Sequence, residues 1–148
     1  MNTREQLDII CKLCEEDATY PPMAYFFVRD AVFKALELIR KRNNQKQFAD
    51  EEPPPADISG RNLALYLKEQ LLEEFGPFAI DILDTWNVKT TADFGKIVFN
   101  LTGKDILAKS DRDSIEDFDD VFDFNEAFVL PFKTLKKPGR KRKKADSE

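Results

Sequence analysis

Two cysteines three residues apart are the first candidates for chemistry. Cys11 and Cys14 form a single CxxC pair. Zinc takes four ligands from Cys, His and carboxylate side chains, but this chain has no second cysteine pair and no histidine. A redox role is favoured when the first thiol lies at a helix N-terminus, whereas the helix expected here begins about two turns before Cys11. The pair is therefore interpreted as two thiols in ordinary apolar packing.

Acidic residues are concentrated between positions 111 and 123 and suggest a calcium loop. An EF-hand loop requires glycine at its sixth position and a bidentate glutamate at its twelfth. Counted from Asp111, these positions hold Glu116 and Phe122, so the motif fails. The acids are interpreted as a solvated loop and a charged strand edge, with a weak, irregular cation site as the alternative. The chain is expected to need no metal and no cofactor. The acidic run consists of Asp111, Asp113, Glu116, Asp117, Asp119, Asp120 and Asp123.

A third candidate is an anion site at Ser59, Gly60 and Arg61. A helix beginning here would present backbone N–H groups and a positive dipole end to an anion, and Arg61 could add its guanidinium group. Helix capping alone also explains Ser59. The chain has neither of the glycine-rich phosphate motifs GxxxxGK[ST] and GxGxxG, and it has no histidine to act as general base. We therefore predict no catalytic residues, and an enzyme is disfavoured.

The C-terminus carries the clearest pattern. Residues 133–148 hold eight Lys or Arg against two acids, a net charge of +6 in a chain of −5, so residues 1–132 carry −11. Such a basic run can bind the phosphates of DNA or RNA without sequence specificity and with strong salt dependence. It contains no aromatic residue for base stacking, and a purely solubilising role remains the alternative. The predicted contacts to nucleic acid are Lys136, Lys137, Arg140, Lys141, Arg142, Lys143 and Lys144.

Helical periodicity dominates the elements that must position these groups. A Thr3–Gln6 capping box predicts a helix that ends near Asp17. Residues 23–42 predict a central helix, because apolar side chains cover all of it except one narrow polar stripe. Residues 43–57 include three consecutive prolines and predict an acidic surface loop.

Three further helices and a hairpin are expected after this loop. Ser59 should cap a helix that runs to Phe75, and Gly76-Pro77 should turn the chain into a helix that includes Trp86. Thr90 or Thr91 should begin the next one. Residues 106–109 and 118–124 alternate as two short strands would. The predicted fold is therefore mainly α, with about five helices and a small C-terminal β-hairpin. Its part from Ser59 to Phe124, three helices and the hairpin, resembles a winged helix.

The predicted organisation is one acidic globular domain over residues 1–131, followed by a disordered segment over residues 132–148, here named the basic tail. No apolar run resembles a signal peptide or a membrane span, so a cytoplasmic protein is expected. DNA readout by the winged-helix-like part is disfavoured, because its wing is acidic and its second helix would expose Asp93, Lys96 and Asn100.

Several short strings in residues 3–130 are distinctive in combination. They are Tyr20-Pro21, residues 25–28, Ser59-Gly60, Phe75-Gly76-Pro77, Trp86, Asp93-Phe94-Gly95, residues 97–101, Asp117-Phe118, Asp123-Phe124 and residues 126–128. Together they resemble an uncharacterised protein family found mainly in planctomycetes and verrucomicrobia. The resemblance implies a bacterial setting and supplies no function and no site residue. It does not cover the basic tail.

These observations lead to one main functional hypothesis. The chain is expected to be a non-enzymatic interaction module whose acidic body binds another protein, while its basic tail binds nucleic acid phosphates. One alternative is a protein–protein adaptor in which the tail docks on its own acidic hairpin. The other is a small enzyme or anion-binding protein that uses the helix start at Ser59–Arg61.

Overall fold

A computed structural model describes residues 2–46, 58–108 and 114–136, and these residues are almost entirely helical. Three short elements join the longer helices: the 3₁₀ helices η1 (Gly76–Phe78) and η2 (Ile115–Phe118), and the π-helix η3 (Asn125–Val129). The α-helices are α1 (Thr3–Glu16), α2 (Pro22–Lys46), α3 (Gly60–Phe75), α4 (Ala79–Thr85), α5 (Thr91–Gly103) and α6 (Leu130–Lys136).

Most helix boundaries follow from local capping. Ser59 Oγ accepts a hydrogen bond from Asn62 N at 3.1 Å, and Thr90 forms a reciprocal capping box with Asp93 at the start of α5. Both predicted starts are confirmed. Gly76 ends α3 with φ at +52°, a conformation that residues with a β-carbon rarely adopt.

The predicted capping box of α1 is wrong by one residue. Asn2 is the N-cap, and its Oδ1 accepts from Glu5 N at 2.8 Å. Gln6 is buried instead of reaching back to the backbone, and it accepts a hydrogen bond from Arg29 Nε on α2. The side chain that was assigned to capping thus connects α1 to α2.

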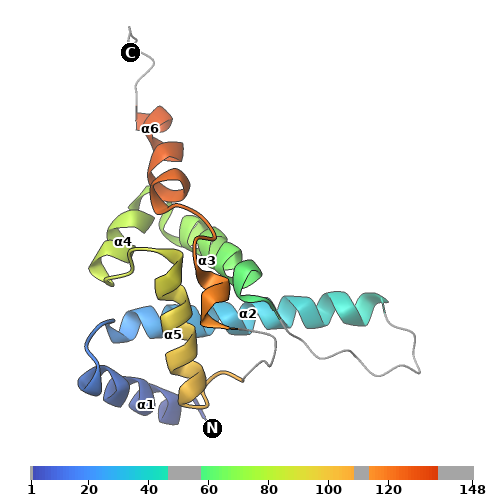
Figure 1. The fold of residues 1–148 in the computed structure, drawn as a ribbon. Coiled ribbons are helices and arrows are strands. Elements are labelled where there is room, and N and C mark those ends of the chain that lie inside the picture. Colours follow the sequence, from blue (N-terminus) through green and yellow to red (C-terminus); the bar gives the residue numbers. More distant parts are fainter. Residues whose placement is uncertain (1, 47–57, 109–113, 137–148) are drawn as a thin grey trace, which may run out of the picture.

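The helix α2 lies at the centre of the arrangement and contacts α1, α3 and α5 (Figure 1). Its buried face consists largely of small or β-branched residues, which lets the neighbouring helices approach closely. The opposite face remains open, with Met23 61% exposed and Phe33 38% exposed. The buried residues are Ala24, Tyr25, Val28, Ala31, Val32 and Ala35.

Two hydrogen bonds that involve tyrosine hydroxyls join α5 to α2 and to the residues just before it. The Tyr20 hydroxyl, just before α2, donates to Asp93 of α5, and Asn100 Nδ2 donates to the Tyr25 hydroxyl at 3.0 Å. The Asp93 and Asn100 side chains therefore face the body and are half-buried, so the expectation that α5 exposes them is wrong.

The predicted β-hairpin and winged-helix module are also wrong, since none of the described residues lies in a β-strand. Ile106 and Leu107 are buried in the turn that follows α5, and Ile115–Phe118 forms the 3₁₀ helix η2. Asp120 has φ at +50°, which interrupts any extended run between Phe118 and Phe124. Residues 109–113, the rest of the predicted hairpin, lie outside the described part.

Aromatic clustering explains why this segment is not a sheet. Phe122 and Phe124 stack with ring centroids 5.7 Å apart, and both pack against Phe94 of α5 and Phe128 of η3. Bulky rings at alternate positions of this segment are buried by packing against α5, as effectively as they would be by packing in a sheet. The alternation of apolar residues therefore reports burial here and not strand geometry.

Acidic residues in the same segment begin helical turns. Asp117 Oδ2 accepts from Ser114 N at 3.0 Å in a capping box for η2, and Asp123 Oδ2 accepts from Glu126 N at 3.0 Å beside η3. Side-chain oxygens that satisfy free N–H groups favour helical starts over strand pairing.

The C-terminal helix α6 follows η3 and projects from the body, at the opposite end from α1 (Figure 1). Helix therefore covers residues 132–136, the first part of the predicted basic tail. Among the helices of the described ranges, none is long and apolar enough to cross a membrane.

Candidate functional site

The predicted nucleic-acid contacts begin at the end of α6. Lys136 is the last residue of that helix. The remaining predicted contacts, Lys137, Arg140, Lys141, Arg142, Lys143 and Lys144, lie outside the described residues.

The proposed anion site at the start of α3 has its three residues in different surroundings. Ser59 is exposed and caps the helix, Arg61 is exposed, and Gly60 is buried. A β-carbon at Gly60 would lie 2.8 Å from Asp117 Cβ and 3.0 Å from the Phe118 ring. Gly60 thus lets η2 approach, and this close packing needs glycine whether or not an anion binds.

Asp117 weighs against anion binding at this helix start. It belongs to the acidic run, and it lies against the N-terminus of α3, where a carboxylate interacts favourably with the helix dipole. Asp117 also lines a groove of about 770 Å³ together with Ser59, Asn62, Arg42 and Glu69. An incoming anion would meet two carboxylates, Asp117 and Glu69, against one base of the groove, Arg42. The anion site therefore stays a prediction, and the two carboxylates weaken it.

The cysteine pair lies on α1 with unequal exposure. Cys11 is exposed, while Cys14 is half-buried and its Sγ lies 3.5 Å from the Tyr20 carbonyl oxygen, to which it donates. Burial raises the pKa of the Cys14 thiol above its usual value, and the neighbouring Cys11 adds to the effect. A raised pKa lowers the fraction of thiolate, which is the nucleophilic and metal-binding form. This geometry fits the packing interpretation for Cys14, but that interpretation is wrong for Cys11, because the Cys11 side chain is exposed.

Carboxylates do not converge in the described part of the acidic run. In residues 2–46, 58–108 and 114–136, no group of three or more Cys, Asp or Glu side chains is arranged to hold a metal ion. Asp111 and Asp113 lie outside these ranges.

A second groove lies between α2, α3 and the end of α4, and sequence reasoning missed it. It has a volume of about 670 Å³. Three rings lie in its wall: Phe27, Phe75 and Trp86, with centroid distances of 5.4 to 6.1 Å. We name it the aromatic groove; it is lined by Met23, Phe26, Phe27, Asp30, Ala31, Phe33, Lys34, Gln70, Glu74, Phe75 and Trp86.

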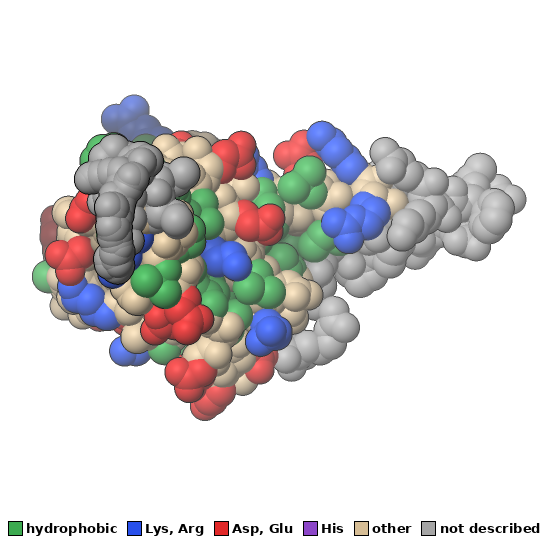
Figure 2. Space-filling view, turned by 90° about the horizontal axis from the view of Figure 1, so that it is seen from above, with side chains coloured by type: hydrophobic (Ala, Val, Ile, Leu, Met, Phe, Trp, Pro, Cys, Tyr) green, Lys and Arg blue, Asp and Glu red, His purple; other side chains and the backbone are tan. Residues whose placement is uncertain are grey.

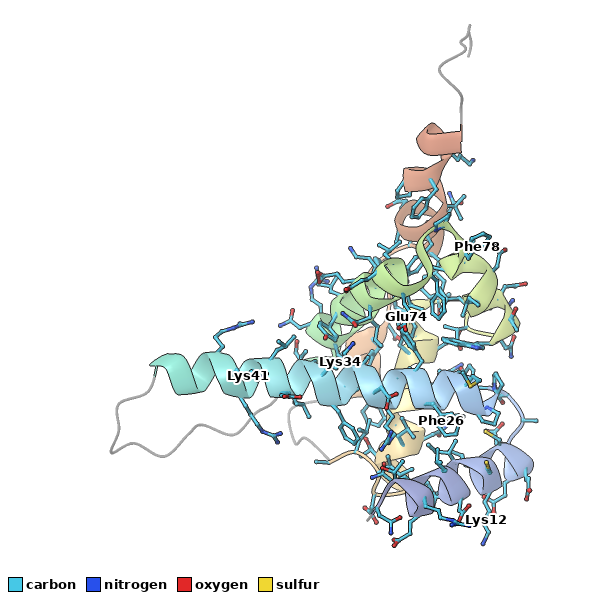
Figure 3. All side chains as sticks on the ribbon, turned by 180° about the vertical axis from the view of Figure 1, so that it is seen from behind. Lys12, Phe26, Lys34, Lys41, Glu74 and Phe78 are labelled. Carbon is cyan, nitrogen blue, oxygen red and sulfur yellow. The ribbon has the colours of Figure 1, made fainter. Side chains whose placement is uncertain are left out.

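Charged side chains border the aromatic groove on both helices. Lys34 of α2 and Glu74 of α3 are visible near one another in Figure 3. Lys34 Nζ donates to Gln70 Oε1 at 3.4 Å, and Asp30 pairs with Arg29 at 2.8 Å. Glu74 is exposed and forms no ion pair with the described residues.

The sequence did contain a signal for this groove. Apolar residues cover so much of residues 23–42 that the prediction placed nearly the whole helix in the core. A chain of this size cannot surround a helix of 25 residues on every side, so part of that apolar surface must face solvent. Which part does so depends on where α1, α3 and α5 pack, and that is a tertiary property.

Searches for similar proteins give no further guidance, since no family model, no curated protein and no solved structure matches the chain. The resemblance to the family from planctomycetes and verrucomicrobia therefore stays a prediction from the quoted strings.

Proposed function

We propose that this protein is a non-enzymatic, cytoplasmic interaction module whose basic tail binds nucleic acid phosphates without sequence specificity. The separation of charge carries the proposal: +6 in residues 133–148 against −11 in residues 1–132. Lys and Arg side chains gain affinity for a polyanion by releasing its condensed counterions, and this gain does not depend on base sequence.

The acidic body would take no part in holding the polyanion. Acidic and basic side chains are interspersed on the face shown in Figure 2, without a broad basic area. Because α6 projects from the body, it carries Lys136 away from these carboxylates (Figure 1). The body would instead bind a protein, and the aromatic groove is more apolar than the groove beside Asp117.

The direct test compares the full chain with a chain that ends at Lys136. This truncation keeps α6, whereas a cut at Phe132 would remove most of that helix. We expect the full chain to bind labelled duplex DNA and RNA at low salt and to lose affinity steeply as salt rises, and the truncated chain to bind far more weakly. Equal affinity of the two chains, or affinity insensitive to salt, would refute the proposal.

One observation favours a second arrangement, in which the tail docks on the acidic segment of its own chain. Glu116, Asp119, Asp120 and Glu126 are exposed, and their side chains form no ion pair with any other described residue. A docked tail would be released as salt screens the attraction, since the Debye length falls from ~10 Å at 0.1 M to ~3 Å at 1 M. Small-angle scattering that shows no salt-dependent expansion of the full chain would count against this arrangement.

A further inference from the structure

We propose that the aromatic groove binds an amphipathic helix of a partner protein, one that places Lys or Arg beside its apolar face. This inference rests on the proposed role of the body as a protein-binding module. It names the surface, the class of partner and the side chain that selects its charge.

The apolar part of the groove suits side chains of a helix. Its aromatic wall is fixed by packing. Trp86 is buried, the Phe75 ring contacts it edge to face, and the Phe27 ring contacts it at a tilt. Met23 and Phe33 remain exposed at the rim of α2. A rigid aromatic wall beside adaptable apolar rim residues is typical of grooves that receive an amphipathic helix.

The dimensions agree with this occupant. From Met23 to Lys34 the groove follows α2 for about 16 Å, because a helix rises about 1.5 Å per residue. That length accommodates roughly three turns of a second helix, with apolar side chains at positions i, i+3, i+4 and i+7.

Charge complementarity selects a basic partner. Asp30, Lys34 and Glu74 line the groove, and the Arg29 guanidinium lies over the ring of Phe33 at 5.0 Å. Glu74 has no counter-ion among the described residues, whereas Asp30 pairs with Arg29. A Lys or Arg of the partner can therefore pair with Glu74, and the net charge of −11 over residues 1–132 repels acidic helices.

The test uses the full chain and two synthetic helical peptides of about 14 residues, a length that suffices for marginal helix formation. One peptide presents a Leu face and a Lys face, and the other replaces every Lys with Glu. We expect the Leu/Lys peptide to bind and to shift the amide NMR signals of residues 23–34 and 70–75. Equal binding of the Leu/Glu peptide, or shifts spread over the whole surface, would overturn the inference.

Matched variants separate the groove from general attraction to an acidic protein. Glu74→Lys should weaken binding of the Leu/Lys peptide about tenfold, whereas Glu73→Lys, next to it on α3 and outside the groove, should weaken it much less. Met23→Ser with Phe33→Ser should have a similar effect to Glu74→Lys. Phe78→Ser removes a ring that is 67% exposed and lies outside the groove, so it should leave the affinity for the Leu/Lys peptide unchanged. Equal effects of the groove and control variants would contradict the proposed site.

The substitutions should leave the fold intact. All the replaced side chains except that of Phe33 are well exposed, so the circular dichroism spectrum and the thermal unfolding temperature should stay close to those of the unchanged protein.

Two other outcomes are decisive. If the protein self-associates in sedimentation and the Met23→Ser, Phe33→Ser variant becomes monomeric, the occupant is a second copy and the proposed partner is wrong. If the unchanged protein binds nucleic acid but does not bind the Leu/Lys peptide, this inference is contradicted while the role of the tail stays in place.

Discussion

At the scale of single residues, one phenylalanine determines how the acidic segment folds onto the body. Phe118 is buried between α3 and α5, and each helix presents a glycine to it, Gly60 and Gly95. A β-carbon at Gly95 would lie 2.9 Å from both Cβ and Cδ2 of Phe118, closer than packed carbons approach. These glycines matter for close packing and not for backbone freedom, because neither has a positive φ.

Gly95→Ala should destabilise the protein. Overpacking costs typically 1–3 kcal/mol, and better helix propensity returns about 0.5–1 kcal/mol, so we expect a net loss of roughly 1–2 kcal/mol. Urea unfolding followed by circular dichroism measures it. Gly103→Ala is the matched control, since it changes the last residue of the same helix and no atom lies within 4 Å of the added β-carbon. A loss in both variants would contradict the packing argument.

The buried hydroxyl of Tyr20 predicts a loss of stability at high pH. Burial raises its pKa well above the usual value, and the hydrogen bond to Asp93 raises it further. The folded state therefore holds this proton more tightly than the unfolded state does. The stabilisation is complete below the unfolded pKa of about 10 and is lost as pH rises above it toward the folded value.

Unfolding free energies measured between pH 8 and pH 11 test this expectation. Tyr20→Phe should be less stable than the unchanged protein near neutral pH, because it loses the hydrogen bond, and its stability should fall less steeply above pH 10. Some dependence will remain, since burial also raises the pKa of Tyr25 and Tyr66. An unchanged slope in Tyr20→Phe would show that Tyr20 does not titrate as argued.

At the scale of elements, local sequence predicted helix boundaries well and strands poorly. Ser59, Thr90 and Gly76 act through atoms within a few residues of themselves, so their spacing suffices to place a start or an end. The even spacing of Phe118, Phe122 and Phe124 does not suffice to identify a strand. The same alternation occurs in an aromatic cluster that packs against α5. The contact of Asp117 with the start of α3 spans more than fifty positions and has no local signal.

The corner between α3 and α4 depends on Gly76. Its φ of +52° is accessible to glycine at little cost, whereas alanine there is strained by about 1–3 kcal/mol. Gly76→Ala should therefore lower the free energy of unfolding by that amount and loosen the packing of Trp86, which chemical denaturation with tryptophan fluorescence would detect together. No steric contact can cause the loss, since nothing lies within 4 Å of the added β-carbon. A change no larger than that of Gly103→Ala would contradict the conformational argument.

At the scale of the whole molecule, two features with different origins define the proposed function. The basic tail is a property of composition, so the sequence alone revealed it. The aromatic groove arises where α2, α3 and α4 meet, so only the fold revealed it. In the proposed function, the body would bind a protein partner and the tail would bind a polyanion.

The salt dependence of nucleic-acid binding tests the central claim most directly. In the full chain, Arg140, Lys141, Arg142 and Lys143 are replaced by Gln, which leaves the body and α6 unchanged. For duplex DNA the slope of log K against log salt is about −0.9 for each phosphate neutralised, so the slope should become shallower by up to ~3.6 as affinity falls. An unchanged slope and affinity would contradict the account, because these four predicted contacts would then neutralise no phosphate.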